Sequence, residues 1–260
     1  MASQVVIPAL RATGNLVTGT DVQTQCVIDA GALPAFAALV RHERRNVRRE
    51  ACWASSNIAA GTAEQIGQLA STPNMVGNLI HQMDKGDWNV QKEAVWAISN
   101  MITSGGDAIV HYAVSCKVLK PMVRMLKVED PKITMVAMEA ITTILEAGRN
   151  PSDVASKNYV DLVEEAGGAD ALEALQQHAN TDIYEKAVAL MEAYYGGGDE
   201  EDVDENLVPA VAVGAKTFTF GSTATTTGSA VFGGFNTQCA PAPAASTGFS
   251  FGMLANTQFK

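Results

Sequence analysis

The chain has 260 residues, enough for one large or two small domains, and its hydrophobic content of 47% supports a globular core. The net charge of −10 and the pI of about 4.8 argue against nucleic acid or anionic membranes as main partners and favour cationic ones. We expect no signal peptide or membrane span, and we expect reduced thiols in a cytosolic or nuclear protein because the spacing of the cysteines is typical neither of disulfides nor of metal sites: Cys26, Cys52, Cys116 and Cys239.

Apolar residues at helical spacing, interrupted by glycines, predict a series of helices. The first covers 4–19. A complete three-helix unit follows over 21–61, with Asp21 as the N-cap of its first helix and a break at Gly31. The helices predicted in this unit are 21–29, 33–42 and 46–60.

The same plan repeats along the chain in units over 62–106, 107–149 and 150–197, the last of which begins with a polar loop over 149–158. The helices predicted in these units are 63–70, 74–84 and 88–104, then 107–115, 118–127 and 130–147, then 159–166, 169–179 and 181–195. Residues 1–20 match only the last helix of such a unit, so we interpret them as the end of a truncated repeat, as in a fragment.

The composition changes after residue 197. An acidic run covers 199–205, and residues 206–260 are rich in Ala, Gly, Thr and Pro, with only two charged side chains. We expect 198–260 to be disordered, because this tail cannot bury enough apolar surface to offset its ordering entropy. Its Phe-Gly pairs are low-complexity filler, which we favour, or stickers for transport receptors: Phe220-Gly221, Phe232-Gly233 and Phe251-Gly252.

Two copies of one pattern, 43 residues apart, lie in predicted third helices. The first copy is Glu50, Trp53 and Asn57, and the second is Glu93, Trp96 and Asn100. At about 100° per residue, the three side chains of each copy fall within an arc of roughly 60°, apart from the apolar stripe. In the next unit the Trp and Asn positions hold Met138 and Thr142, so the pattern ends there, and we interpret Met138 as a core or rim residue.

This combination predicts a ladder for an extended, basic peptide. An Asn amide can pair with both polar groups of a peptide unit, an indole attracts Lys or Arg by about 0.5–2 kcal/mol, and Glu adds complementary charge. Stacked helices lie about 8–10 Å apart and an extended peptide rises about 3.3 Å per residue, so one repeat matches roughly three peptide residues. Asn15 lies 42 residues before Asn57 and continues the Asn row, with Arg11 in the Trp position. A Trp at helical spacing usually packs in a core, but two copies in one register favour the ladder.

Units of 42–43 residues with one short and two longer helices are typical of armadillo repeats. We therefore predict an all-α, right-handed superhelical solenoid of about four armadillo repeats plus a leading helix. Three stretches also resemble the C-terminal half of the importin-α (karyopherin-α) array: P-A-L-R-A-T-G-N-L-V-T-G at 8–19, E-A-C-W-x-x-S-N at 50–57 and K-E-A-V-W-A-I-S-N at 92–100. The acidic run resembles that family's C-terminus, whereas the Phe-Gly tail departs from it.

The resemblance implies an adaptor for nuclear localisation signals that carries only the family's minor binding site. It implies a Trp/Asn ladder, acidic partners for Lys or Arg, an Arg that interrupts the Trp array, and two further groove positions. These residues are Trp53, Trp96, Asn57 and Asn100 for the ladder, with Asn15 continuing it; Glu50 and Glu93 as acids; Arg11; and Thr18 and Asp21.

The resemblance also implies partners and a location. The last repeat, around 159–197, resembles the region where the family meets its nuclear export receptor with RanGTP and a nuclear-basket nucleoporin. An importin-β family receptor would bind only if a missing N-terminal segment exists. We expect shuttling between cytoplasm and nucleus, with no cofactor, metal, nucleic acid or membrane partner, and a chain that holds cargo weakly or competes with a full-length adaptor.

Two other function classes compare poorly with this one. An enzyme is not expected, because the sequence has no nucleophile elbow, metal-ligand cluster, P-loop or dinucleotide fingerprint, and its histidines are scattered: His42, His81, His111 and His178. A catenin-like armadillo scaffold for adhesion or signalling is the alternative, and it would need Lys or Arg along the groove.

One basic cluster stands outside the ladder, around the start of the helix predicted at 46–60. It consists of Arg41, Arg44, Arg45, Arg48 and Arg49. A nucleic-acid patch and a solvated surface both fit this cluster, and the acidic overall charge favours the solvated surface.

Overall fold

The computed structural model describes residues 3–149 and 158–196, all of which belong to the first of the chain's two compact units, Met1–Gly198. Most of the predicted loop over 149–158, the acidic run and the Phe-Gly tail lie outside the described residues. The described part contains thirteen α-helices and no strand. Nine of the thirteen predicted helices have the predicted bounds within one residue at each end: α2 (Asp21–Asp29), α4 (Arg45–Ala59), α5 (Ala63–Ser71), α6 (Met75–Lys85), α7 (Trp88–Ser104), α8 (Asp107–Ser115), α10 (Pro131–Ala147), α11 (Tyr159–Glu165) and α13 (Thr181–Tyr194).

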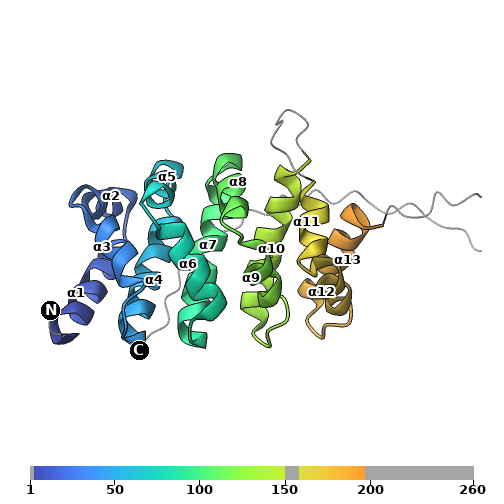
Figure 1. Ribbon diagram of the computed structural model, residues 1–260, viewed down its shortest axis with the longest axis horizontal. Coiled ribbons are helices and arrows are strands. Elements are labelled where there is room, and N and C mark those ends of the chain that lie inside the picture. Colours follow the sequence, from blue (N-terminus) through green and yellow to red (C-terminus); the bar gives the residue numbers. More distant parts are fainter. Residues whose placement is uncertain (1–2, 150–157, 197–260) are drawn as a thin grey trace, which may run out of the picture. The chain divides into compact units, whose positions relative to one another are not determined.

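The helices follow the predicted repeat plan (Figure 1). The other helices are α1 (Ser3–Leu16), α3 (Ala32–Leu39), α9 (Leu119–Met125) and α12 (Gly168–Leu175). The protein is therefore an all-α solenoid.

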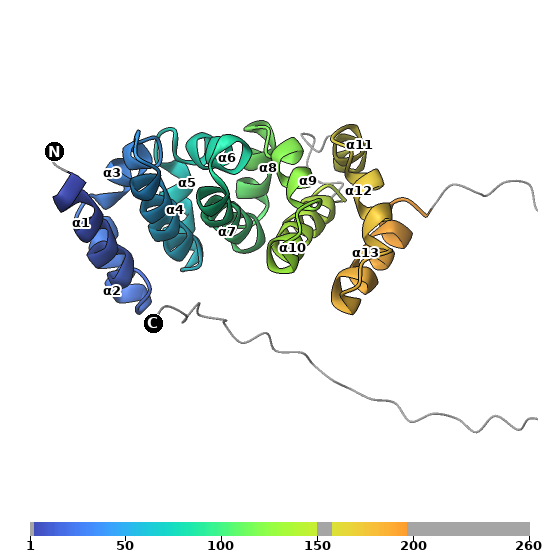
Figure 2. The same cartoon turned by 90° about the horizontal axis from the view of Figure 1, so that it is seen from below.

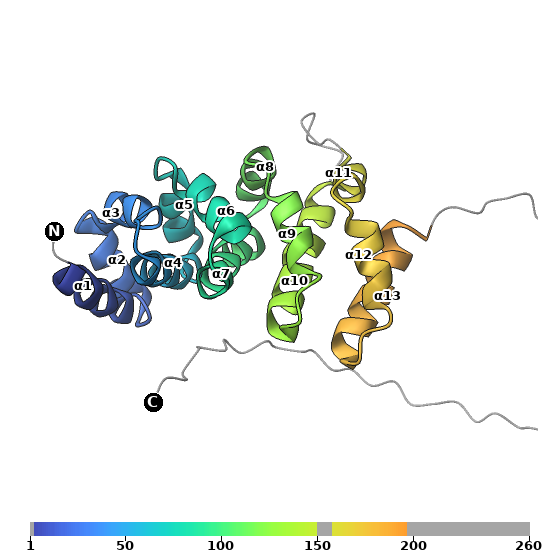
Figure 3. The ribbon, with the colours of Figure 1, turned by 60° about the horizontal axis from the view of Figure 1, so that its bottom comes forward.

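The third helices of the repeats form one continuous row. Contacts link α1 to α4, α4 to α7, α7 to α10, and α10 to α13. The first and second helices of the units pack along one side of this row (Figures 2 and 3). Residues at the same position of successive third helices therefore come from neighbouring helices, which is what a ladder of side chains requires.

Local capping decides where the first helix of a repeat begins. We predicted Asp21 as an N-cap, but the N-cap is Thr20, whose hydroxyl accepts the Gln23 N–H at 3.4 Å while the Gln23 carboxamide accepts the Thr20 N–H at 2.8 Å. Asp21 is instead the first helical residue, where its negative charge suits the helix dipole. The same reciprocal box forms at Thr62, the N-cap of α5.

Three of the four second helices, α3, α9 and α12, end earlier than predicted, because their last turns change hydrogen-bond spacing. After α3, the N–H groups of Arg41 and His42 bond to carbonyls three residues back, at 3.2 and 3.1 Å. The same shift follows α9 and α12. The chain keeps turning in these segments but with the tighter three-residue ring, so apolar periodicity continues past the end of the α-helix.

One hydrophobic core runs through all the repeats. Met138, at the Trp position of α10, is completely buried, which confirms it as a core residue and explains why the ladder stops before it. Side-chain amides link the other layers of successive repeats. The Gln65 amide donates to the Asp21 carbonyl at 2.8 Å, and the Asn78 amide donates to the Ala37 carbonyl at 2.9 Å.

Among the described helices, none alone has the length and hydrophobicity to cross a bilayer. The one pair that passes such a test together, α2 with α3, is bent by 83°.

Candidate functional site

The two ladder tryptophans are partly buried on neighbouring third helices, Trp53 on α4 and Trp96 on α7. The Trp53 ring lies against the backbone of α1 at Gly14, so closely that a Cβ at residue 14 would overlap its benzo edge. The Trp96 ring packs on the edge of the core cluster. Both indoles are therefore held by packing on one side while part of each surface stays accessible.

The ladder asparagines reach across to the preceding third helix. Asn57 donates from Nδ2 to the Gly14 carbonyl at 3.5 Å, and Asn100 donates from Nδ2 to the Ser56 carbonyl at 3.2 Å. In both cases the acceptor carbonyl belongs to the residue just before the Asn of the preceding helix: Gly14 precedes Asn15, and Ser56 precedes Asn57. Each amide thus uses one N–H to link repeats, and its second N–H and its Oδ1 have no hydrogen-bond partner among the described residues.

The row weakens toward the N-terminal end. Asn15, Thr18 and Asp21 are all exposed. The Thr18 hydroxyl donates to the Asn15 carbonyl at 2.7 Å, which closes the end of α1 and leaves the hydroxyl oxygen free to accept. Asn15 lies in the last turn of α1, Thr18 follows that helix and Asp21 begins α2, so the structure places them near the ladder's start and not on its central helices.

Glu50 is paired inside the chain. It is only 4% exposed, and its Oε1 accepts from Arg11 Nε at 3.1 Å and from Arg49 Nη2 at 2.6 Å. Such a buried, charge-assisted set is costly to break, because an unpaired buried carboxylate loses its solvation without compensation. A ligand cation at Glu50 must therefore compete with two arginines, which the sequence pattern did not indicate.

Glu93 is the less satisfied acid of the ladder. Burial raises its pKa to about 7, Arg49 and Lys92 oppose that rise, and the charge of Glu50 adds to it. The carboxyl is thus close to half protonated at neutral pH. A cation placed beside Glu93 would offset the cost of burying its charge, which makes this position the better one for a Lys or Arg of a ligand.

The ladder ends at α10 in a physically distinct way. The Thr142 hydroxyl donates to the Met138 carbonyl of its own helix at 2.8 Å and makes no link to α7. The Ser99 side chain of α7 is 2% exposed, and its hydroxyl has no hydrogen-bond partner among the described residues. The link between repeats that Asn57 and Asn100 provide is therefore missing at this step.

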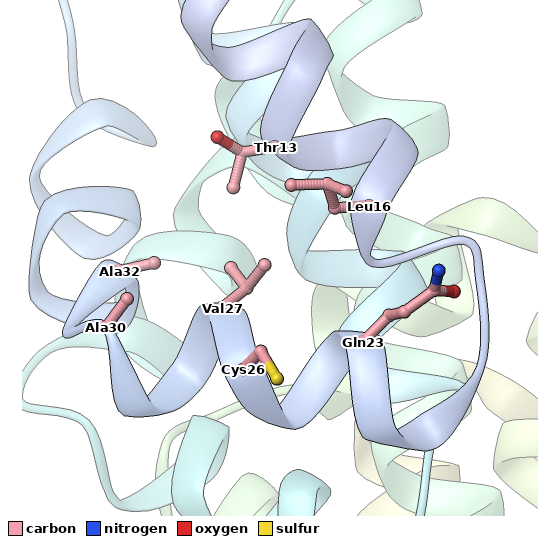
Figure 4. Close-up of a pocket in the computed structure, with 7 residues that line it drawn as sticks. All are labelled: Thr13, Leu16, Gln23, Cys26, Val27, Ala30 and Ala32. Carbon is pink, nitrogen blue, oxygen red and sulfur yellow. The ribbon is translucent and has the colours of Figure 1, made fainter.

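A cavity of about 440 Å³ lies beside the N-terminal end of the ladder, between α1, α2 and α3 (Figure 4). Its lining is mostly small and apolar: Thr13, Leu16, Gln23, Cys26, Val27, Ala30 and Ala32. It contains no charged group, so it offers nothing to recognise a basic ligand.

The described residues contain no group of three or more His, Cys, Asp or Glu side chains arranged to hold a metal ion. Cys26, Cys52 and Cys116 are free thiols, and burial, reinforced by Glu93, raises the pKa of Cys52. Two histidines act locally: His42 Nδ1 accepts the Arg44 N–H at 3.0 Å, and His178 Nδ1 accepts the Asn180 N–H at 3.0 Å.

Sequence reasoning missed two residues that shape the site. Gly14 provides the surface on which Trp53 rests and the carbonyl to which Asn57 bonds. A glycine inside a helical pattern was the available signal, because it costs about 1 kcal/mol relative to alanine and so indicates close packing. Arg49, which pairs with Glu50, had no such signal among five neighbouring arginines.

Comparison with known proteins agrees with this architecture. Residues 20–60 match the Armadillo/beta-catenin-like repeat, and residues 157–210 match the family described as Atypical Arm repeat. Importin subunit alpha-1a of Oryza sativa subsp. japonica is 45% identical over 221 residues, which cover 84% of this chain and 41% of that protein. Importin subunit alpha-3 of Arabidopsis thaliana is 38% identical over 225 residues, with the same two coverages of 84% and 41%.

The fold also matches solved structures. A designed armadillo repeat protein, YIII(Dq.V1)4CPAF in complex with peptide (KR)4, superposes with a TM-score of 0.64 at 32% identity, covering 74% of this chain and 77% of that one. This chain spans about two fifths of the length of the curated relatives it matches. With the repeat plan, the register of the ladder and these relatives in agreement, the chain belongs to the importin-α family and its described helices form an armadillo region.

Proposed function

We propose that the face formed by Trp53, Asn57, Trp96 and Asn100 binds extended, basic peptides of the nuclear localisation signal type. The observation that carries this proposal is the pair of partly accessible indoles on adjacent third helices, each with a side-chain amide in the same register that keeps hydrogen-bonding capacity. Lys92 already lies 5.6 Å from the ring centroid of Trp88, an example within this chain of a cation on an indole. The (KR)4 peptide in the complex of the designed armadillo protein is a basic ligand, like the one proposed for this chain.

The charges suggest how such a peptide is positioned. Arg11 is exposed on 59% of its side chain and, with Arg49, neutralises Glu50. Lys or Arg side chains of a ligand are therefore disfavoured at the N-terminal end of the ladder and favoured between Trp53 and Trp96, beside Glu93. Two indole contacts and the amide bonds sum to several kcal/mol before ordering costs, so about micromolar affinity is the ceiling.

The direct test is a titration of the whole chain with a labelled Lys/Arg-rich signal peptide and with a length-matched Asp/Glu-rich peptide. We expect the basic peptide to bind the ladder face. Its affinity should fall as the salt concentration rises, because charge contributes to the contact. Fluorescence anisotropy measures both. The readout specific to the ladder is competition by an unlabelled basic peptide, and failure of the basic peptide to bind would favour the catenin-like scaffold.

Glu93→Gln should weaken binding of the basic peptide and remove the pH dependence of that binding. With a pKa of about 7, ionisation of Glu93 should raise affinity by up to about tenfold between pH 6 and 8 in the wild-type chain. The same shift lowers stability as pH rises from 4.5 to 7, because the folded chain keeps a proton that the unfolded chain has lost. The variant should therefore melt at a higher temperature than wild type at pH 8.

Glu173→Gln is the matched control, because Glu173 is exposed on α12 and forms no ion pair with another described residue. It should change neither the pH profile of binding nor the difference in melting temperature. A pH profile that survives in Glu93→Gln would assign the titration to another group.

The wider role follows from the same proposal. A chain that binds nuclear localisation signals would act in nuclear import and shuttle between cytoplasm and nucleus. The repeat around α11–α13 would meet an export receptor with RanGTP. An importin-β family receptor would bind only if a further N-terminal segment exists. Fluorescence microscopy of the tagged chain, with and without a block of nuclear export, measures the shuttling.

A further inference from the structure

A second charged surface lies on the turn between α3 and α4. Four arginines fall within residues 41–48, opposed in that segment only by Glu43, in a chain whose net charge is −10. We call these four the arginine turn: Arg41, Arg44, Arg45 and Arg48. All are exposed except Arg48, which is partly buried.

The turn is braced from within. Arg48 donates from Nη1 to the carbonyls of His42 and Glu43, at 3.0 and 2.8 Å, and from Nη2 to Asp87 Oδ2 at 2.8 Å. His42 in turn accepts the Arg44 N–H. One arginine thus holds the backbone of the turn in a defined shape and ties it to the start of α7.

The charges of Arg41 and Arg45 are not neutralised by a neighbouring carboxylate in the described part of the chain. Among the described residues, no carboxylate lies within ion-pair distance of Arg41 or Arg45. Asp84, on the adjacent turn, is already paired with Lys85 and Arg124. The field reaches α6, where burial first and then the charge of Arg41 lower the pKa of His81.

The direction of α4 adds to this potential. The helix begins at Arg45, and its N-cap, Arg44, supplies no side-chain acceptor for the first N–H groups. The positive end of a 15-residue helix therefore points into the arginine turn.

We propose that the arginine turn is a docking site for a short Asp/Glu-rich segment of a partner protein. Its preference is opposite to that of the ladder face, so the two surfaces would take different ligands. Guanidinium groups bind carboxylates with two parallel hydrogen bonds, which suits a cluster of exposed arginines on a rigid turn.

The size of the surface favours a peptide over nucleic acid. The corresponding segment of the next repeat, from the end of α6 to the N-cap of α7, carries Asp84, Lys85 and Asp87, so the basic area ends after one repeat. A nucleic-acid backbone would need positive charge over a longer track, and the acidic chain around the arginine turn would repel it.

The test is binding of a labelled Glu-Asp repeat peptide to the whole chain and to Arg41→Gln with Arg45→Gln. Removing two exposed cations should lower the affinity for the acidic peptide roughly tenfold at low salt, and the affinity should then depend less steeply on salt concentration. Circular dichroism should show unchanged helix content, because neither side chain forms an ion pair or a hydrogen bond with another described residue. The basic signal peptide should bind the variant no worse than wild type.

The matched control is Lys120→Gln with Lys127→Gln, which removes the same charge from exposed positions two repeats away. It should leave acidic-peptide binding within about twofold of wild type. Equal weakening by both variants, or no binding of the acidic peptide to wild type, would overturn the proposal. A labelled single-stranded oligonucleotide that binds more tightly than the peptide, and is lost in the Arg41/Arg45 variant, would overturn it in favour of nucleic acid.

Discussion

Replacing Trp53 and Trp96 together with alanine is expected to abolish measurable binding of a basic signal peptide while helix content stays near that of wild type. Each indole contributes about 0.5–2 kcal/mol to a contact with Lys or Arg, so losing both removes about 1–4 kcal/mol. From micromolar affinity at best, that loss carries binding beyond ordinary titration ranges. Anisotropy measures the affinity and far-ultraviolet circular dichroism measures the fold.

Trp88→Ala is the control for this experiment. Trp88 is 39% exposed at the start of α7, outside the ladder register, and Lys92 already occupies its ring. This variant should retain wild-type affinity for the peptide. If the double variant binds as well as Trp88→Ala, the ladder assignment is wrong, whatever else the chain binds.

Gly14→Ala is expected to destabilise the folded chain by about 1–3 kcal/mol and to weaken binding of the basic signal peptide at the same time. In an open helix this change would stabilise by about 1 kcal/mol, because alanine is the better helix former. Here the new methyl group would overlap the Trp53 ring, so the ring or α1 itself must move. Either movement also disturbs the Asn57 bond to the Gly14 carbonyl.

Two other helical glycines give the opposite expectation. A Cβ at Gly67 in α5 or at Gly77 in α6 would meet nothing within 4 Å. Gly67→Ala and Gly77→Ala should therefore raise the melting temperature and leave peptide binding unchanged. Thermal unfolding followed by circular dichroism compares the three, and a Gly14→Ala chain that is stabilised like the controls would show that Trp53 does not depend on α1.

The sequence by itself determined the repeat plan and the register of the ladder. Glycines at helix ends, apolar spacing and the distance between Trp53 and Trp96 are local or periodic properties, and most of the described helices form where these signals place them. The end of the ladder at Met138 was also readable, since an apolar residue in the Trp position belongs to the core. Even the Thr20 cap had a local signature, Thr-x-x-Gln, that competed with the neighbouring Asp21.

The tertiary structure alone decided how the ladder residues are used. Glu50 meets Arg11 across 39 residues, the Trp53 ring rests on Gly14 of another helix, and burial moves the pKa of Glu93 toward neutrality. These features depend on the distance and orientation between third helices, which arise only when the repeats stack. Sequence periodicity assigns a side chain to a face of its helix, but many of the charges and surfaces that the ladder meets come from third helices roughly 40 residues away, in the neighbouring repeats.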